Sequence, residues 1–367
     1  MAKLGEVCLI NPKSCTLRDD TEVSFIPMTK VGEHGEFDAS EIKNYSEVKK
    51  GFTNFQNGDI LFAKITPCME NGKGAIANNM KNGIGFGSTE FHVLRPDTDK
   101  ITSEWLYYLT TWKTFRKEAE RNMTGSAGQK RVPKTFLENY VVSLPDIDTQ
   151  KSENKILRKV DDLIFLRKQQ LSKLDELVKA RFVEMFGDPV SNPMGWKRVR
   201  FDSISENLDS KRVPVTESDR KEGVYPYYGA SGIVDWINDY IFDEDILLVS
   251  EDGANLLMRS TPIAFSVSGK SWVNNHAHVV RFHDFATQKF IEVYFSLIDI
   301  SEYITGTAQP KLNQAKLNTM LFCWPPLSLQ KQFAAFVERV DQQKQTVQQS
   351  LEKLELMKKA LMQEYFG

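Results

Sequence analysis

Two stretches of the chain, residues 149–187 and 329–367, carry apolar residues at heptad spacing within a charged background. An apolar residue every three or four positions predicts a helix with one apolar seam. At 1.5 Å per residue, each helix would be about 55 Å long. The seam residues are Leu157, Val160, Ile164, Leu171, Leu174, Val178 and Met185 in the first stretch, and Val337, Val340, Val347, Leu351, Leu354, Leu361 and Tyr365 in the second.

Charged residues interrupt each seam, at positions where the other seam has an apolar residue. Neither helix can therefore bury its seam alone, and we expect the two helices to pair with each other within one chain. An independent surface helix is the alternative interpretation. The interrupting residues, with their counterparts in parentheses, are Arg167 and Arg181 (Val347 and Leu361) and Lys344 and Lys358 (Ile164 and Val178).

The segments before these two stretches show short β-branched and aromatic runs bounded by Gly, Asn and Pro, which predict strands and turns. A longer run with helical spacing follows the strands in each segment, at 103–121 and at 289–304, with Ser103 as a possible N-cap. The predicted fold class is therefore α+β, with two α/β domains and two long helices. The predicted strands lie in 23–28, 58–65, 72–77 and 91–96, and in 225–237, 239–252, 260–267 and 278–282.

An internal repeat explains why the same pattern occurs twice. "ARFVEMFG" (180–187) resembles "ALMQEYFG" (360–367), and residues 122–163 align with residues 303–344. A period of about 180 residues is far too long for a solenoid repeat, so we expect a duplicated module of a globular part and a long helix. In the aligned loops, Thr124-Gly125, Ala127 and Lys130 fall on Thr305-Gly306, Ala308 and Lys311.

The repeat also predicts the domain boundaries. "DPVSNPMGW" (188–196), rich in Pro, Asn and Gly, joins the two copies. We expect a first globular domain at 1–148, a central helix at 149–187, a second globular domain at 188–328 and a distal helix at 329–367. The two globular sequences otherwise differ widely, as expected of two modules that bind different things.

Composition narrows the class of protein. The chain has 367 residues, 41% of them apolar, and a formal net charge of −2, so any basic surface must be local. The four cysteines contain no C-x-x-C pair, which argues against a disulfide framework and a zinc site. No apolar run approaches the roughly 18 residues of a membrane span, and "MAKLGEVCLI" is too short and polar for a signal peptide. We expect a cytoplasmic protein without a membrane partner.

Three motifs that could carry catalysis are weak. "AFSVSGKS" (264–271) satisfies a Walker A pattern, but the sequence that follows alternates like a strand instead of opening a helix. "NPM" and "WPPL" (324–327) lack the full Asn-Pro-Pro-aromatic run of adenine methyltransferases, and no Gly-rich cofactor loop accompanies them. His276 and His278 share a strand face without an evident third metal ligand. We expect neither catalysis nor a metal site.

Nucleic-acid binding is better supported. Between Lys113 and Lys134 the chain carries a basic run that includes Arg116, interrupted by the small residues of "MTGSAGQK", whose backbone can approach a phosphate closely. A solvated basic face is the alternative, but it does not require the second copy to repeat this loop with Lys311. The loops "KITPCMENGKGA" (64–75), "YPYYGASG" (225–232) and "SEDGAN" (250–255) supply amide, hydroxyl and carboxylate groups suited to base edges.

Together these features resemble the specificity subunit of type I restriction-modification systems. The likeness covers nearly the whole chain: two variable α/β modules, each followed by a repeated helix that ends near Phe-Gly. The segments that carry it are "NGDILFAKITPCMENGKGA", "GSTEFHVLRP", "YPYYGASGIVDWI", "LLVSEDG", "WPPLSLQKQF" and "FVEMFGDPVSNPMGW".

The resemblance implies two target recognition domains separated by two antiparallel helices that form a coiled coil, with pseudo-twofold duplication. It implies recognition of double-stranded DNA at an interrupted sequence, one half-site per domain, without catalysis by the chain. Two modification subunits would methylate adenine with S-adenosylmethionine, and added restriction subunits would translocate and cut DNA with ATP and Mg. This chain itself would bind no cofactor or metal.

Matching motifs also imply the DNA-side residues. In the first module they are Lys64, Thr66, Asn71, Lys73, Thr89, Glu90, Ser126, Gln129 and Lys130. In the second module they are Tyr227, Tyr228, Ser231, Glu251, Asp252, Asn274, Asn275, Gln309 and Lys311. Two alternatives stay open: the specificity chain of a fused restriction-methylation enzyme, and a protein scaffold without DNA contact.

Overall fold

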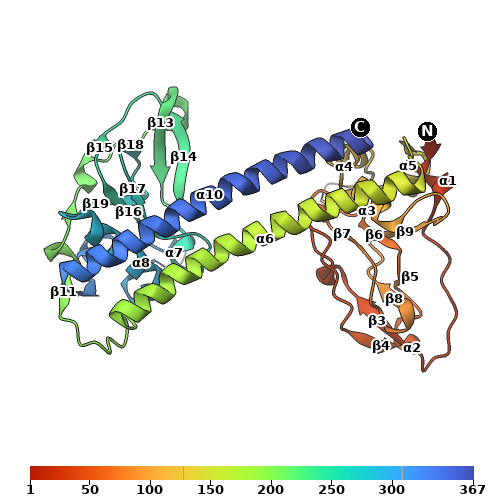
Figure 1. Ribbon diagram of the computed structural model, residues 1–367, viewed down its shortest axis with the longest axis horizontal. Coiled ribbons are helices and arrows are strands. Elements are labelled where there is room, and N and C mark those ends of the chain that lie inside the picture. The colour runs from red at the N-terminus through yellow and green to blue at the C-terminus, as the bar shows by residue number, and fades with distance from the viewer. Residues whose placement is uncertain (127, 307–308) are drawn as a thin grey trace. The chain divides into compact units, whose positions relative to one another are not determined.

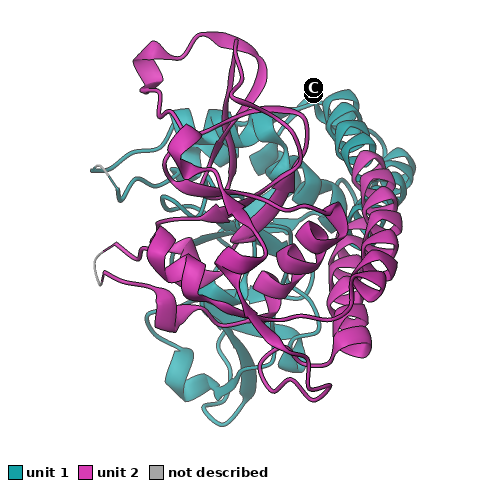
Figure 2. Cartoon of the chain, turned by 90° about the vertical axis from the view of Figure 1, so that its left-hand side faces the viewer, with its two compact units in different colours: residues 1–166, 351–367 teal, residues 167–350 magenta. Residues whose placement is uncertain are grey.

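The computed structural model describes residues 1–126, 128–306 and 309–367, and the chain divides into two compact units. Unit 1 comprises Met1–Leu166 and Leu351–Gly367, and unit 2 comprises Arg167–Ser350 (Figure 2). Helices α6 (Ile147–Phe186) and α10 (Leu327–Phe366) are 40 residues long, and each contributes one end to each unit. No helix in the described ranges is both long and apolar enough to cross a membrane.

Unit 1 contains two four-stranded sheets and a short antiparallel pair, β1 with β10. Figure 1 labels the strands β3 to β9 of these sheets. One sheet has the order β2-β9-β6-β7, with antiparallel neighbours throughout. The other has the order β4-β3-β8-β5, in which β3 and β8 are parallel. The strands are β1 (Ala2–Lys3), β2 (Cys8–Ile10), β3 (Glu22–Ile26), β4 (Ile42–Asn44), β5 (Thr53–Gln56), β6 (Ile60–Ala63), β7 (Gly74–Ile76), β8 (Ile84–Gly87), β9 (Phe91–Pro96) and β10 (Val141–Val142).

Unit 2 contains the same arrangement with other strands. Its sheets have the orders β12-β19-β16-β17 and β14-β13-β18-β15, its central pair β13 and β18 is parallel, and β11 pairs with β20. The strands are β11 (Arg198–Arg200), β12 (Glu206–Asn207), β13 (Glu222–Gly229), β14 (Gly232–Ile237), β15 (Phe242–Asp243), β16 (Ile246–Ser250), β17 (Ala264–Val267), β18 (Lys270–Val273), β19 (Ala277–Arg281) and β20 (Leu321–Cys323).

The two units therefore share one topology, strand by strand: each strand of unit 1 corresponds to the strand of unit 2 whose label is higher by ten. This confirms the predicted α+β fold with an internal duplication. The duplication extends through the globular parts, although their sequences differ widely. The aligned residues Ala127 and Ala308 lie outside the described residues.

The bounds of the shorter helices differ from the sequence prediction. The helix predicted at 289–304 is α8, which spans Phe285–Leu297. The helix predicted at 103–121 is two helices, because the backbone of Trp112 is extended (ψ 130°). The N-cap is Thr102, whose hydroxyl accepts from the backbone N–H of Trp105, whereas the hydroxyl of Ser103 donates to the carbonyl of Gly58. The shorter helices are α1 (Leu4–Val7), α2 (Tyr45–Val48), α3 (Ser103–Thr111), α4 (Lys113–Arg121), α5 (Lys134–Asn139), α7 (Asn255–Met258), α8 (Phe285–Leu297) and α9 (Gln314–Thr319).

The long helices pair antiparallel in each unit. In unit 1, Lys358 of α10 forms an ion pair of 2.6 Å with Asp161 of α6. In unit 2, Lys344 forms an ion pair with Asp175. The interrupting lysines are therefore neutralised by aspartates of the other helix, which explains how the two seams tolerate them. This confirms that the helices pair within the chain; the domain boundaries inferred from the repeat stay a prediction.

The apolar residues at the helix ends enter the cores of the units. In unit 2, Phe182 and Phe186 of α6 pack against Phe290 of α8 and Phe333 of α10, with ring centroids 4.9 to 5.5 Å apart. In unit 1, Phe366 packs on Trp105 of α3 at 4.7 Å. Each core thus includes residues from both long helices, so neither unit is complete without them.

Removing one of these rings should destabilise the protein. We expect Phe182→Ala to lower the free energy of unfolding of unit 2 by about 3–5 kcal/mol, because it leaves a cavity among four aromatic rings. Urea unfolding followed by circular dichroism measures the change. Phe165→Ala on the same helix is the control, since that side chain is 60% exposed and should cost little. Equal effects of the two variants would contradict this description of the core.

Candidate nucleic-acid interface

Main-chain hydrogen bonds bring three loops of unit 1 together at one end of β6. The amide of Lys64 donates to the carbonyl of Glu90 (2.9 Å), and the amide of Val132 donates to the carbonyl of Lys64 (2.9 Å). One step further, the amide of Thr66 donates to the carbonyl of Lys130 (3.0 Å). We call the surface formed by residues 64–66, 88–90, 124–126 and 128–131 face 1.

Unit 2 uses the same hydrogen bonds. The amide of Glu251 donates to the carbonyl of His276 (2.9 Å), and the amide of Leu312 donates to the carbonyl of Glu251 (2.8 Å). The turn between β13 and β14 joins them, since the hydroxyl of Ser250 donates to the carbonyl of Ala230. We call residues 229–232, 251–253, 274–276 and 309–311 face 2. Glu251 therefore occupies the position of Lys64, and His276 that of Glu90.

In each unit, one cationic side chain of the repeated loop pairs with a carboxylate. On face 1, Arg131 makes a two-pronged contact with Glu90 (2.8 and 2.9 Å), which lowers the pKa of that carboxyl. On face 2, Lys311 pairs with Glu251 at 3.0 Å. Backbone bridges join Thr124 to Arg131 and Thr305 to Lys311. The structural counterpart of Lys311 is thus Arg131 and not Lys130, because the loop of unit 2 is one residue shorter.

The remaining predicted residues of face 1 lie at its surface or its edge. Lys130, Gln129, Ser126 and Thr89 are exposed, and Lys64 is half-buried. Three further predicted residues lie in or beside the turn after β6. The hydroxyl of Thr66 donates to Glu70 (2.7 Å), and Lys73 donates to the carbonyl of Met28 (3.3 Å). Asn71 is exposed.

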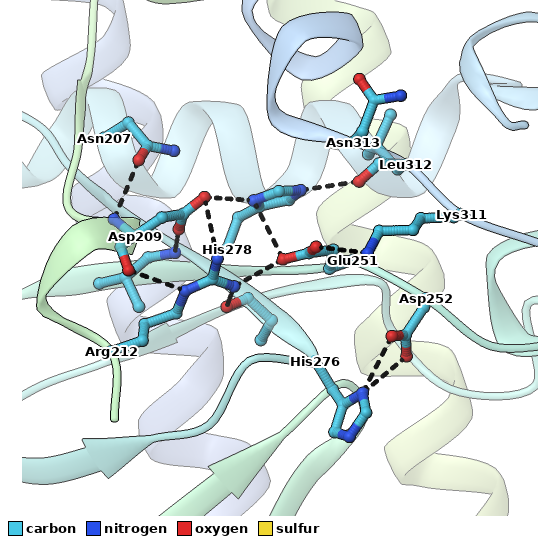
Figure 3. Close-up of polar contacts among 12 residues, drawn as sticks. Asn207, Asp209, Arg212, Glu251, Asp252, His276, His278, Lys311, Leu312 and Asn313 are labelled. Carbon is cyan, nitrogen blue, oxygen red and sulfur yellow. Dashed lines mark hydrogen bonds and ion pairs between the residues drawn. The ribbon is translucent and has the colours of Figure 1, made fainter. Parts of the chain in front are cut away.

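A network of charged groups lies beneath face 2 (Figure 3). The guanidinium of Arg212 donates to Glu251 (2.6 Å) and lies 3.4 Å from Asp209, while His278 contacts Asp209 at 2.6 Å. Burial on its own would raise the pKa of Asp209 and of Glu251. The hydrogen bonds from His278 to Asp209, and from Arg212 and Lys311 to Glu251, outweigh burial and lower both pKa values.

This cluster could in principle hold a metal, since Asp209, Glu251 and His278 each bring a ligand atom within 4.8 Å of the others. Two cations already satisfy the carboxylates, because Arg212 lies against both and Lys311 pairs with Glu251. A buried divalent ion beside that guanidinium would be repelled by it. The arrangement therefore fits an ion-pair network better than a metal centre.

Three of the predicted residues of unit 2 point inward, which corrects their assignment as DNA contacts. Tyr227 is only 1% exposed, and its hydroxyl accepts from the backbone N–H of Val215 (3.0 Å). Asn274 is buried and accepts from the amide of His276 (2.8 Å). Glu251 is buried in the network described above. All three hold neighbouring loops instead of presenting a free group to a ligand.

The other predicted residues of face 2 are accessible in part. Ser231, Asn275, Gln309 and Lys311 are exposed. Asp252 is half-buried and pairs with His276 at 2.9 Å, and Tyr228 is half-buried against Phe265. The structure therefore brings most of the predicted set together on one face in each unit.

Arg116 does not belong to the basic surface predicted around it. Its side chain is buried, donates to the carbonyl of Met69 (2.6 Å) and lies over the ring of Phe62. Burial lowers the pKa of this guanidinium to about 10. The Walker-like segment is also structural: its residues form the strand β17, a turn and the start of β18, as the alternating pattern indicates.

The sequence interpretation missed His92, Asp209 and Arg212. A usable signal was present in the repeated motif His-Val-x-Arg, at His92–Arg95 and His278–Arg281. Both copies of the motif lie on equivalent strands, since β9 and β19 occupy the same position in their sheets.

Comparison with known proteins identifies relatives of both modules. The family model described as "Type I restriction modification DNA specificity domain" matches residues 1–176 and 193–356. The specificity subunit of the type I restriction enzyme EcoAI of Escherichia coli is 46% identical over 178 residues, 47% of this chain and 30% of that protein. That of EcoEI, also of Escherichia coli, is 41% identical over 179 residues, 47% of this chain and 29% of that protein. The matched region thus spans less than a third of these curated relatives.

Solved structures share the fold at low sequence identity. A specificity subunit of a type I restriction-modification system from M. genitalium aligns with all of this chain and 95% of its own, at 13% identity and a TM-score of 0.57. A chain from a structure of a type I restriction-modification assembly aligns over 99% of this chain and 96% of its own, at 16% identity and a TM-score of 0.57. At these identities the likeness concerns the fold alone.

The charged network makes the stability of unit 2 depend on pH. The pKa values of Asp209 and Glu251 are lowered in the folded state, so their ion pairs stabilise the fold above the unfolded pKa of about 4. We expect this stabilisation to disappear as pH falls through the folded values. Glu251→Gln should weaken the pH dependence and lower the free energy of unfolding at pH 7 by about 2 kcal/mol.

Urea unfolding between about pH 3 and pH 7, followed by tryptophan fluorescence, checks this expectation. Glu302→Gln provides the control, because that carboxylate is exposed. Identical pH profiles for Glu251→Gln and the unsubstituted protein would show that the network does not stabilise unit 2.

Proposed function

This chain belongs to the family of type I restriction-modification DNA specificity domains, and we propose that it recognises an interrupted DNA sequence, one half with each unit. In this proposal face 1 reads one half-site and face 2 reads the other. The chain would select the DNA and leave the chemistry to partner subunits.

One observation carries the proposal most directly: equivalent backbone positions on the two faces present different side chains. Glu90 on face 1 is replaced by the exposed His276 on face 2, and Thr89 is replaced by Asn275, within the same set of main-chain hydrogen bonds. Two units that share one backbone arrangement but differ in their surface side chains suit a target made of two unlike half-sites. A scaffold that bound the same partner twice would not need this difference.

The chemistry of each face supports contact with DNA. On face 1, Lys130 and the small residues beside it are exposed and can approach a phosphate. Thr89 on face 1 and Asn275 on face 2 occupy the same exposed position, and either side chain can hydrogen-bond a base edge. Asn71 and Asp252 are the further candidates for base contacts.

Partner subunits complete the proposed assembly. Specific modification would require two adenine methyltransferase subunits with S-adenosylmethionine, each acting on an adenine flipped from one half-site. Restriction subunits would add translocation and cleavage with ATP and Mg. Helix α6 offers exposed apolar residues for docking, namely Ile156, Leu163, Phe165 and Leu166 in unit 1 and Leu177 and Val183 in unit 2.

The loop cations give the first test. We expect Lys130→Ala and Lys311→Ala to weaken DNA binding to a similar degree on every sequence, because phosphate contacts carry no sequence information. Each should reduce the slope of log K against log salt by about one. Gel shifts on the complex with the methyltransferase, over a series of salt concentrations, measure both effects.

Lys331→Ala is the matched control, because Lys331 lies on α10 and pairs with Asp284 instead of lining either face. Changes at Asn71 or Asp252 should instead alter the preference at one half-site by roughly 1–3 kcal/mol. If Lys130→Ala leaves the salt slope unchanged, this loop does not contact the backbone of DNA.

The helix pair gives the second test, because its length would set the gap between half-sites. Arg167 of α6 donates to Ser350 of α10 (3.2 Å), so four residues inserted after Gln169 and four after Gln348 lengthen both helices near matched positions. The insertion adds about 6 Å of helix. At about 3.4 Å per base pair, we expect the gap to grow by one or two base pairs.

Sequencing of methylated adenines in cells that carry the double insertion reads out the gap, while both half-site sequences should persist. The single insertion after Gln169 is the control, since it shifts the pairing of the helices and should lower activity. An active double-insertion variant with the original gap, or with changed half-site bases, would mean that the helix pair does not set the gap between the half-sites.

A further inference from the structure

A buried histidine occupies the same position in both units. His92 of β9 is 4% exposed and His278 of β19 is 1% exposed. The Nε2 atom of His92 lies 2.7 Å from the carbonyl oxygen of Val132, and the Nε2 atom of His278 lies 2.7 Å from that of Leu312. Because a carbonyl only accepts, Nε2 carries a proton in both rings.

These two carbonyls belong to the ends of the repeated loops. Val132 directly follows Arg131, and Leu312 directly follows Lys311. The histidine in each unit therefore ties the base of the loop that presents the cation to the central strand of the sheet. The same bond in two units with little sequence likeness argues against a chance contact.

The second ring nitrogen has a different partner in the two units. In unit 1, Nδ1 of His92 lies 3.0 Å from Nδ2 and 3.3 Å from Oδ1 of Asn11, and this Oδ1 accepts from the amide of Val93 (3.0 Å). The nearer group is the Nδ2 donor, so we assign Nδ1 as the acceptor, which leaves the ring of His92 neutral. Burial also lowers the pKa of His92.

In unit 2 the corresponding group is a carboxylate. Nδ1 of His278 lies 2.6 Å from Oδ2 of Asp209, whose Oδ1 accepts from the amide of Val279 (2.8 Å). Asp209 has a lowered pKa and accepts only, so Nδ1 must donate as well. With both nitrogens donating, the ring of His278 is positively charged.

We propose that His92 and His278 are positioning residues that anchor the cation-bearing loops of the two faces, the first as a neutral ring and the second as a charged ring. A neutral ring has one N–H and cannot donate to both Leu312 and Asp209. The two bonds of His278 therefore require the charged ring, whereas the single bond from His92 to Val132 requires only a neutral ring.

Other charges around the two rings agree with this difference. His278 faces Asp209 and, at 3.7 Å, Glu251, with Arg212 beyond them and Lys311 on the far side of Glu251. The charges near His92 are Lys64, Lys134 and Glu90, of which two are positive. Unit 2 thus places two carboxylates beside its ring, whereas unit 1 places two lysines and one carboxylate near its own. That these loops contact DNA rests on the proposed function, whereas the anchoring of the loops by the two histidines does not.

The test uses the full chain labelled with ¹⁵N-histidine and does not require DNA. At neutral pH we expect the two ring nitrogens of His278 to give the shifts of a protonated imidazolium, and those of His92 to give one protonated and one unprotonated nitrogen. His92→Gln and His278→Gln assign the signals. A neutral His278 or a charged His92 under these conditions would overturn the proposal.

Exchanging the partner groups provides a matched pair of variants. Asp209→Asn should make the ring of His278 neutral, and Asn11→Asp should make the ring of His92 charged. Hydrogen exchange at neutral pH then measures the protection of the two loops. We expect His278→Gln to lower protection around 309–312 by about tenfold, and Asp209→Asn to leave it unchanged, because a neutral ring keeps the N–H that donates to Leu312.

The loop of unit 1 is the internal control, because its protection around 128–132 should fall in His92→Gln and stay constant in His278→Gln. If His278→Gln leaves the protection around 309–312 unchanged, the anchoring role of His278 is wrong. Failure of DNA binding alone, with these results unchanged, would refute the proposed function and not the anchor.

Discussion

The structure depends on one constraint: neither long helix can bury its apolar seam without the other. Each core therefore takes residues from both helices, with Phe182 and Phe333 packed together in unit 2 and Leu157 and Phe366 in the core of unit 1. This explains why unit 1 is discontinuous in sequence and includes the last residues of the chain. A change at one end of either helix acts on the core of the unit that contains it.

On this shared frame the two units keep the same backbone and change the side chains. The loops after β6 and β16 are held by equivalent hydrogen bonds, yet one begins with Lys64 and the other with Glu251. The compensation is local: Glu251 is surrounded by Arg212, Lys311 and His278, while Arg131 pairs with Glu90. The scaffold thereby allows the recognition chemistry to vary without a change of fold.

Periodicity and repetition in the sequence predicted the long helices, their pairing and the α+β duplication, because these depend on spacing alone. Spacing could not reveal the break at Trp112 or the burial of Tyr227, since both are set by packing between distant segments. It also misaligned Lys311 with Lys130, because a one-residue difference in loop length leaves the surrounding pattern unchanged. The residues of the faces that would touch DNA remain a prediction, because base contacts depend on which side chains are exposed and not on the spacing of residues in the sequence.

The most direct measurement is the set of methylated adenines in a cell that expresses this chain with a methyltransferase of the same system. The account predicts a single interrupted sequence with two defined halves, absent when the chain is deleted. Substituting Asn275 should then change the bases of one half and leave the other half and the gap intact. Methylation that persists without the chain, or that follows one uninterrupted sequence, would contradict recognition by two separate faces.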